Sequence, residues 1–189
     1  MENAESTIIT RCQAGELEQF AQLYDVYIKK IYSFIFYKTS HKETAEDLTS
    51  QTFFKALQNI NKYDSTKGSF SSWLYRIARN NVIDYYRSKK NAIDIDAIWD
   101  LSTDSDIERD IDVKQKLQEV SKHLNKLKPL QKEIVVMRLW DQLSYQEISE
   151  ITKNSVANSK MIFSRSIRKL REEMSLIILF FVINITNII

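Results

Sequence analysis

The sequence predicts an all-α protein with two small helical domains joined by an acidic, flexible linker, the C-terminal domain being a helix-turn-helix. Only two of the 189 residues are glycine and one is proline, which argues against a sheet-rich fold with many tight turns. Apolar residues recur every three or four positions along most of the chain, the spacing of amphipathic helices. A hydrophobic content of 43% is enough to form a buried core.

The charge is distributed unevenly along the chain. Residues 91–112 contain eight acidic residues and one arginine, a net charge of −7, so the rest of the chain carries +9 of the total of +2. Two basic segments separated by an acidic connector are typical of a protein that contacts a polyanion at two places. The connector itself is predicted to be an extended or mobile tether, and mimicry of nucleic acid in a basic channel is the alternative.

The composition limits the other function classes. Cys12 is the only cysteine and there are two histidines, so neither a disulfide framework nor a Cys/His metal site is expected, and no cofactor is implied. The first 16 residues lack the basic start and apolar core of a secretory signal, which favours a cytoplasmic protein. There is no glycine-rich phosphate loop and no nucleophile-base pair, so an enzyme is disfavoured.

Three helices are expected before residue 60. A short one ends near Gly15, and a long one runs from Glu16 with its apolar stripe reaching Ile35. The pair Ser40 and Glu43 fits a capping box that starts the third helix, which continues to about Ile60.

The third helix has one apolar and one polar side. Its spacing directs Leu48 and Phe53 toward a core and leaves Asp47, Gln51 and Phe54 outside or at its edges. An exposed aromatic residue beside carboxylate and amide groups indicates either a partner surface or a solvated helix face.

The stretch 62–90 combines a polar loop, aromatic residues and a basic helix. The loop holds Gly68 among serine, threonine and lysine, residues that break helices. Phe70 and Trp73 begin a helical stripe that is read either as core or as a platform for an unstacked base. In the second reading Asn80 contacts the edge of that base, with arginines from the same helix nearby.

The C-terminal part predicts a helix-turn-helix. Helical spacing returns at Val113, stops at Pro129 and resumes over residues 131–141. Ser144 and Glu147 form a capping box for a short helix that ends at a turn over residues 152–155. Residues 151–171 contain six basic residues and no acidic one, so the last helix is suited to a major groove.

These motifs together resemble the extracytoplasmic function (ECF) sigma factors of bacterial RNA polymerase. AEDLTSQTFFKAL resembles the helix that binds the clamp helices of the largest polymerase subunit, and FSSWLYRIARNNVIDYYRSKK the segment that opens and reads the minus-ten promoter element. LKPLQKEIVVMRLWDQLSYQEISEITKNSVANSKMIFSRSIRKLR resembles the domain that reads the minus-thirty-five element and sits on the polymerase flap. The resemblance implies domains over residues 1–92 and 113–173, a linker over 93–112 and a tail over 174–189.

The resemblance also implies roles for individual residues. Those expected to bind core polymerase are Asp47, Leu48, Gln51, Phe53 and Phe54. Those expected to bind minus-ten DNA are Phe70, Ser71, Ser72, Trp73, Arg76, Arg79, Asn80 and Arg87. Those expected to bind minus-thirty-five DNA are Ser155, Asn158, Ser159, Lys160, Arg165 and Arg168. An anti-sigma factor is a further partner expected from the family.

The sequence departs from the family at three motifs and in its tail. Ser50 and Gln51 replace the usual Gln and Glu, which removes a charge from the polymerase contact. Asp141-Gln142 replaces the usual Glu-Gly, and Lys153 replaces a common turn glycine. The apolar run in the tail spans only residues 176–183, whereas a membrane helix needs about 20 residues. The tail is open to three other interpretations: contact with a membrane surface, contact with an anti-sigma factor, or a disrupted reading frame.

The residues leave two other function classes open. A two-domain helix-turn-helix regulator would bind duplex DNA tightly without polymerase, whereas a sigma factor binds promoters poorly until core enzyme is present. The hypothesis of a membrane-tethered interaction protein is supported by the tail alone.

Overall fold

The computed structural model describes residues 2–90 and 123–173, which belong to two compact units. Every regular element in these two ranges is a helix. The all-α prediction and the two helical domains are therefore confirmed. The predicted linker, the start of the helix expected from Val113 and the apolar tail lie outside the described residues. Among the residues described, no helix is long and apolar enough to cross a membrane.

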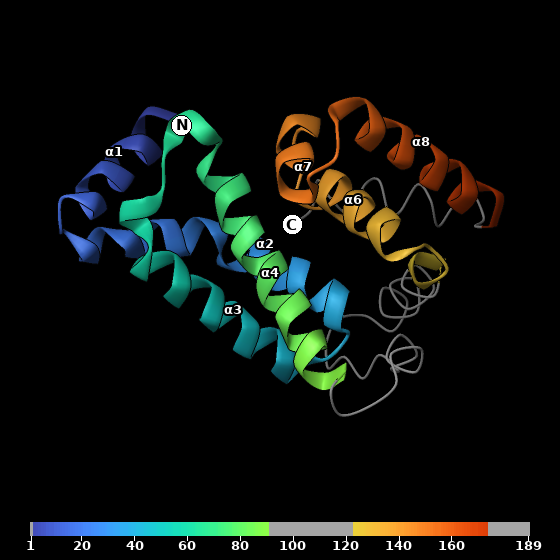
Figure 1. Ribbon diagram of the computed structural model, residues 1–189, viewed down its shortest axis with the longest axis horizontal. Helices are drawn as coiled ribbons and strands as arrows, with labels where there is room; N and C mark the ends of the chain where they lie inside the picture. The colour runs from blue at the N-terminus through green and yellow to red at the C-terminus, as the bar shows by residue number, and fades with distance from the viewer. Residues whose placement is uncertain (1, 91–122, 174–189) are drawn as a thin grey trace, which may run out of the picture. The chain divides into compact units, whose positions relative to one another are not determined.

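The first unit is built around three long helices, α2 (Phe20–Thr39), α3 (Lys42–Gln58) and α4 (Phe70–Lys90). Each of the three packs against the other two, and α1 (Glu2–Gln13) packs on α2 (Figure 1). Short 3-10 turns connect them: η1 (Leu17–Gln19), η2 (Ile60–Lys62) and η3 (Ser65–Lys67).

Aromatic and aliphatic side chains from α2 and α4 form the centre of this unit. Phe34 and Tyr75 meet edge to face with ring centroids 5.1 Å apart, and both are buried. Ile31 and Leu74 are buried completely beside them. Burying one such side chain contributes about 1.5–3 kcal/mol, so this contact between α2 and α4 fixes the position of the basic helix.

Two helix starts differ from the prediction. The long helix begins at Phe20, because residues 17–19 form a 3-10 turn in which Leu17 is 48% exposed. The capping box at Ser40 is wrong: Ser40 adopts a left-handed φ of 51° and ends α2, donating its N–H to the Phe36 carbonyl at 2.7 Å. The Nδ1 atom of His41 accepts from the Thr44 N–H at 3.3 Å and caps α3 instead.

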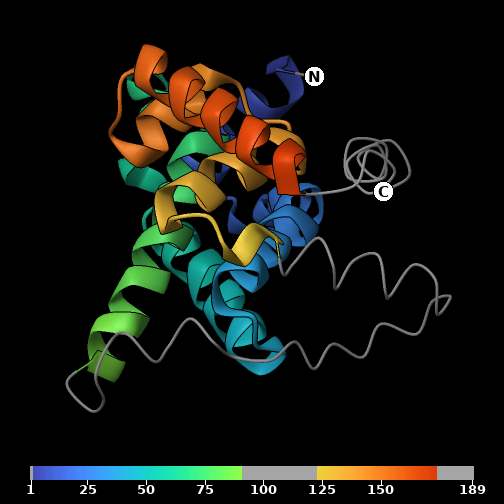
Figure 2. The same cartoon turned by 90° about the vertical axis from the view of Figure 1, so that its right-hand side faces the viewer.

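The second unit contains α6 (Pro129–Leu139), α7 (Tyr145–Thr152) and α8 (Val156–Glu173). Helix α8 packs on both α6 and α7 (Figure 2). A small core joins α6 and α8 to the residues that precede Pro129, and its buried members are Leu124, Leu127, Val135 and Leu170. Helix α6 begins at Pro129 and not at residue 131, because proline needs no N–H partner in the first turn.

The predicted capping box before α7 is confirmed. Ser144 Oγ accepts from the Glu147 N–H at 3.2 Å, and the Glu147 carboxylate accepts from the Ser144 N–H at 2.9 Å. Gln142 and Lys153, the two residues that replace family glycines, have left-handed φ angles of 56° and 58°. The glycine-type backbone is thus kept in both turns without glycine, at a cost of about 1–2 kcal/mol for each residue.

Candidate nucleic-acid interface

The loop between α3 and α4 is held by its own side chains. Asp64 Oδ1 accepts from the backbone N–H and the hydroxyl of Thr66, at 3.0 and 2.7 Å. Lys67 Nζ lies 3.1 Å from the other carboxylate oxygen. The hydrogen bond from the Thr66 side chain, followed by that from Lys67, lowers the pKa of Asp64 to about 2. The predicted polar loop is therefore a defined turn held by these contacts.

The end of this loop is shaped by Gly68. Its φ of 141° and ψ of 170° are open to glycine and strained for other residues. The hydroxyl of Tyr63 donates to the Gly68 carbonyl at 3.2 Å. Ser69 Oγ then accepts from the Ser72 N–H at 3.1 Å, which satisfies an amide in the first turn of α4.

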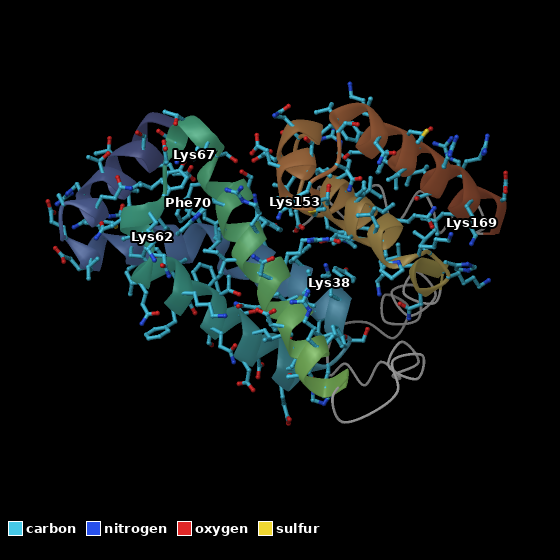
Figure 3. The ribbon with its side chains drawn as sticks, in the orientation of Figure 1. Lys38, Lys62, Lys67, Phe70, Lys153 and Lys169 are labelled. Atoms are coloured by element: carbon cyan, nitrogen blue, oxygen red, sulfur yellow. The ribbon has the colours of Figure 1, made fainter. Side chains whose placement is uncertain are left out.

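Three aromatic rings meet beneath the loop. Tyr63, Phe70 and Trp73 contact one another with all three centroid distances between 5.5 and 5.6 Å. Figure 3 shows Phe70 between Lys62, which ends η2, and Lys67, which ends η3. Phe70 is only 1% exposed, whereas Trp73 is half-buried. Phe70 is thus not accessible to a base, whereas Trp73 and the half-buried Tyr63 are partly accessible, and of these two Trp73 lies on α4 itself.

Three residues of the predicted minus-ten set are buried in the free chain. These are Phe70, Ser71 and Ser72, and the Ser72 hydroxyl donates to the Ser69 carbonyl at 3.0 Å. The exposed or half-buried members of the set therefore offer a base more side-chain surface than these three do.

One stripe of α4 remains accessible. The spacing of Trp73, Arg76, Asn80 and Arg87 places them within a narrow arc of the helix. Asn80 and Arg87 are exposed, Trp73 and Arg76 half-buried. Arg79 lies about 100° around the helix from Asn80 and is also half-buried.

The neighbouring amide, Asn81, has a different role. It is 3% exposed, donates from Nδ2 to Thr52 Oγ1 at 2.9 Å and accepts from Lys55 Nζ at 2.6 Å. The local sequence pattern does not indicate this role, because both partners of Asn81 are contributed by another helix. Asn81 holds α4 on α3, so the adjacent Asn80 faces outward.

Helix α3 carries the predicted polymerase surface on its other side. Asp47, Gln51 and Phe54 are exposed at a spacing of four and three residues, which puts them on one stripe. Phe54 is 60% exposed, a large fraction for a phenylalanine.

Leu48 and Phe53, two residues of the predicted polymerase set, are both buried. The Phe53 ring packs on Tyr24 at a centroid distance of 4.8 Å. The periodicity of the sequence placed these two residues in the core, and the resemblance placed them on the polymerase surface. The periodicity was right.

The first turns of α8 are fixed by polar contacts. Ser155 Oγ accepts from the Asn158 N–H at 3.1 Å, and Asn158 Nδ2 donates to Asn154 Oδ1 at 2.9 Å. Ser159 is fully buried and its hydroxyl has no hydrogen-bond partner. Among the residues predicted to contact minus-thirty-five DNA, Ser159 is therefore the one whose side chain is buried in the free chain. Lys160, Arg165 and Arg168 are exposed along the same helix.

Lys160 is positioned by an aromatic residue that sequence analysis did not identify. Its ammonium group lies 5.7 Å from the centroid of Tyr145, and the Arg138 guanidinium lies 4.9 Å from the same ring. Phe163 meets this ring edge to face at 5.9 Å. Tyr145 therefore joins all three helices of the unit and holds two cations near the start of α8.

The chemistry of these surfaces is that of binding. Among residues 2–90 and 123–173, no group of three or more His, Cys, Asp or Glu side chains could hold a metal ion. Among the residues of α4 and α8 predicted to bind DNA, the accessible groups are cations, amides, a hydroxyl and an aromatic ring, which recognise phosphates and bases, whereas the α3 stripe also exposes the Asp47 carboxylate.

Two family models match the chain. Sigma-70 region 2 matches residues 23–92 and Sigma-70, region 4 matches residues 117–170. The first range contains the α3 and α4 surfaces, and the second contains the helix-turn-helix.

Curated relatives cover most of the chain. It is 30% identical to the ECF RNA polymerase sigma factor SigM of Bacillus subtilis, over 79% of this chain and 91% of SigM. It is 30% identical to the RNA polymerase sigma factor YlaC of the same organism, over 84% of this chain and 93% of YlaC. The ECF sigma factor BldN of Streptomyces coelicolor is 32% identical over 86% of this chain, which spans 63% of BldN.

Solved structures show the same fold. The sigma factor RpoE in complex with the anti-sigma factor NepR, from Bartonella quintana, matches with a TM-score of 0.69 and 22% identity, over 82% of this chain and 96% of RpoE. CnrH in complex with the cytosolic domain of CnrY matches with a TM-score of 0.67 and 20% identity, over 87% of this chain and 92% of CnrH. The family models and the relatives establish that this chain belongs to the ECF RNA polymerase sigma factors, the promoter-recognition subunits of RNA polymerase.

Proposed function

We propose that this sigma factor opens its promoters by capturing an unstacked minus-ten base against α4, while α8 occupies the major groove at the minus-thirty-five element. The observation that carries this proposal is the accessible stripe of Trp73, Arg76, Asn80 and Arg87 beside a well-held loop. The stripe presents a ring face, an amide and two cations in a row, which are the groups that bind a base and its phosphates.

Base capture assigns a role to each group of the stripe. Trp73 supplies a surface for stacking, and the Asn80 amide supplies a donor and an acceptor for the edge of the base. Arg76 and Arg87 lie one turn before and two turns after Asn80, where they contact the backbone of the separated strand. Unpairing a base costs a few kcal/mol, and these contacts offset that cost.

Helix α3 is the proposed docking surface for core polymerase. Asp47, Gln51 and Phe54 form its exposed stripe. Phe54 supplies apolar area at the centre of the contact, and the polar groups of Asp47 and Gln51 form directional hydrogen bonds with the partner. The contact is made with the clamp helices of the largest subunit, and the flap receives the second unit.

Upstream recognition is assigned to α8. Asn158 and Lys160 lie in its first turns, where a recognition helix reads base edges, and Ser155 precedes them at the helix start. Arg165 and Arg168 lie further along and contact phosphates. The chain thus binds two promoter elements with two separate units.

The chain is a specificity subunit and not an enzyme, since polymerase supplies the phosphoryl chemistry. It acts in the cytoplasm, where core polymerase and the chromosome are found. An anti-sigma factor is proposed as a further partner because RpoE and CnrH, which share this fold, were solved with protein partners.

Run-off transcription on a promoter library tests the function. Purified core polymerase is assayed with and without the chain, and with an Asn80→Ala variant. Transcripts with defined start sites are expected only with the chain and are expected to be lost with the variant. Asn61→Ala, an exposed asparagine on η2, is the matched control and is expected to be active. Sequence-specific binding of DNA by the free chain, without core-dependent initiation, would instead establish a helix-turn-helix regulator.

A further inference from the structure

The last residue of α1 bridges two turns that lie far along the chain. Gln13 Nε2 donates to the Ile60 carbonyl at 3.0 Å and to the Tyr63 carbonyl at 2.9 Å. An amide nitrogen has two hydrogens, so both donors are used. The two carbonyls stand at the beginning of the loop that precedes α4, and Gln13 therefore fixes where this loop starts.

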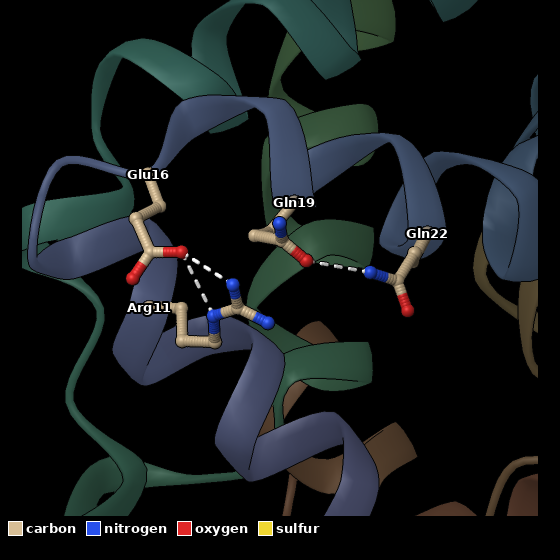
Figure 4. Close-up of polar contacts among 4 residues, drawn as sticks. All are labelled: Arg11, Glu16, Gln19 and Gln22. Atoms are coloured by element: carbon tan, nitrogen blue, oxygen red, sulfur yellow. Dashed lines mark hydrogen bonds and ion pairs between the residues drawn. The ribbon is translucent and has the colours of Figure 1, made fainter.

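Gln13 is itself held firmly. Cys12, which precedes it, is completely buried, and Arg11 in the same last turn of α1 binds the Glu16 carboxylate through Nε and Nη2 at 2.9 and 2.6 Å (Figure 4). The other end of α1 is attached to α2, since the hydroxyl of Tyr27 donates to Glu5 at 2.6 Å. Helix α1 is thus tied to the unit at both ends, and the Gln13 amide starts from a fixed backbone.

Tyr63 connects Gln13 to Trp73, the first residue of the accessible α4 stripe. Its carbonyl accepts from Gln13, and its hydroxyl donates to the Gly68 carbonyl at the far end of the loop. Its ring contacts Trp73 at a centroid distance of 5.6 Å. The position of Trp73 relative to the loop therefore depends on Tyr63, and that of Tyr63 depends on Gln13.

We propose that Gln13 is a positioning residue for promoter opening, which it supports by holding Tyr63 and thereby Trp73 in place for base capture. The inference rests on the proposed function of α4. It also adds an element to the opening machinery, because the region 2 match begins at residue 23 and α1 lies before it.

The first test is made on the free full-length chain. Gln13→Leu removes both hydrogen bonds, and Gln13→Glu keeps the size and polarity of the side chain while removing both donors. In each variant we expect the amides of Thr66 and Lys67 to exchange with solvent at least about fivefold faster, since each of the two hydrogen bonds contributes about 1 kcal/mol. Gln22→Leu is the matched control, because the Gln22 amide also donates at 2.8 Å but to Gln19, away from the loop (Figure 4).

The second test uses holoenzyme on a promoter that the wild-type chain opens. We expect the Gln13 variants to slow opening about fivefold, with unchanged affinity for core polymerase and for a minus-thirty-five duplex. Opening and loop exchange equal to wild type would overturn the inference. Parallel losses of opening, core affinity and duplex affinity would also overturn it, because they indicate a general structural role. A wild-type chain that opens no promoter would overturn the proposed function and, with it, this role, whatever the exchange rates show.

Discussion

The carboxamide of Asn81 donates a 2.9 Å hydrogen bond to Thr52 Oγ1, joining α4 to α3 inside the first unit. Asn80, the residue that precedes it in the chain, is exposed. The two adjacent asparagines of α4 therefore have different roles. Asn81 attaches the helix to α3, and Asn80 is available to a ligand.

The structural role of Asn81 and the binding role of Asn80 can be distinguished by substitution. Asn81→Ala leaves the Thr52 hydroxyl and the Lys55 ammonium without their partner, and we expect the free energy of unfolding of the first unit to fall by about 1–3 kcal/mol. Asn80→Ala removes an exposed side chain and is expected to change it by less than about 0.5 kcal/mol. Urea denaturation of each variant measures both values. Equal losses for the two variants would contradict the assignment of Asn81 as the structural amide.

Lys153 offers a way to stabilise the helix-turn-helix. Its φ of 58° is unfavourable for a residue with a Cβ atom, so Lys153→Gly is expected to stabilise the second unit by about 0.5–1 kcal/mol. Gln146→Gly, inside the exposed part of α7, is the control and is expected to destabilise by about 1 kcal/mol. Thermal unfolding followed by circular dichroism compares the two. A lower melting temperature for Lys153→Gly would show that the turn does not require the left-handed conformation.

Ser159 and Ser155 are expected to behave in opposite ways. Ser159 is buried with no partner for its hydroxyl, so Ser159→Ala is expected to keep or raise stability and leave duplex affinity unchanged. Ser155 caps α8, so Ser155→Ala is expected to cost about 1 kcal/mol. Denaturation and duplex binding by holoenzyme measure both effects. A strong loss of minus-thirty-five affinity in Ser159→Ala would restore the role first predicted for it.

The loop before α4 is expected to loosen in acid. Hydrogen bonds from Thr66 and Lys67 hold the pKa of Asp64 at about 2, below its ordinary value of 3.8. A lowered pKa in the folded state means that the contribution of this carboxylate is complete above about pH 4 and is lost as the pH falls toward 2. The protection of the Thr66 amide, which compares its observed exchange rate with the intrinsic rate at the same pH, should therefore fall over this window. Asp64→Asn should remove that dependence, and an unchanged pH profile in this variant would contradict the assignment.

The sequence was informative where local patterns decide the structure. Helical spacing correctly placed Leu48 and Phe53 in the core, and the capping box at Ser144 is present as predicted. The similar box at Ser40 failed, because Ser40 adopts the left-handed conformation that ends α2 and His41 caps α3 one residue later. Local signals alone do not decide between them.

Long-range contacts could not be predicted. The role of Gln13 depends on carbonyls 47 and 50 residues away, and that of Asn81 on a hydroxyl 29 residues away. Burial likewise divided the candidate minus-ten set, because Phe70 and Trp73 are adjacent on the helical stripe but only Trp73 remains accessible. These long-range hydrogen bonds and differences in burial arise when the helices pack, and the spacing of residues along the sequence does not predict them.

The most direct measurement is permanganate reactivity of thymines in the minus-ten element, in holoenzyme containing either the wild-type chain or Asn80→Ala. Capture of a base against α4 predicts that the wild-type thymines react and that those with the variant stay protected, while both holoenzymes bind the minus-thirty-five duplex equally. Thymines that react equally with both chains would contradict base capture by Asn80.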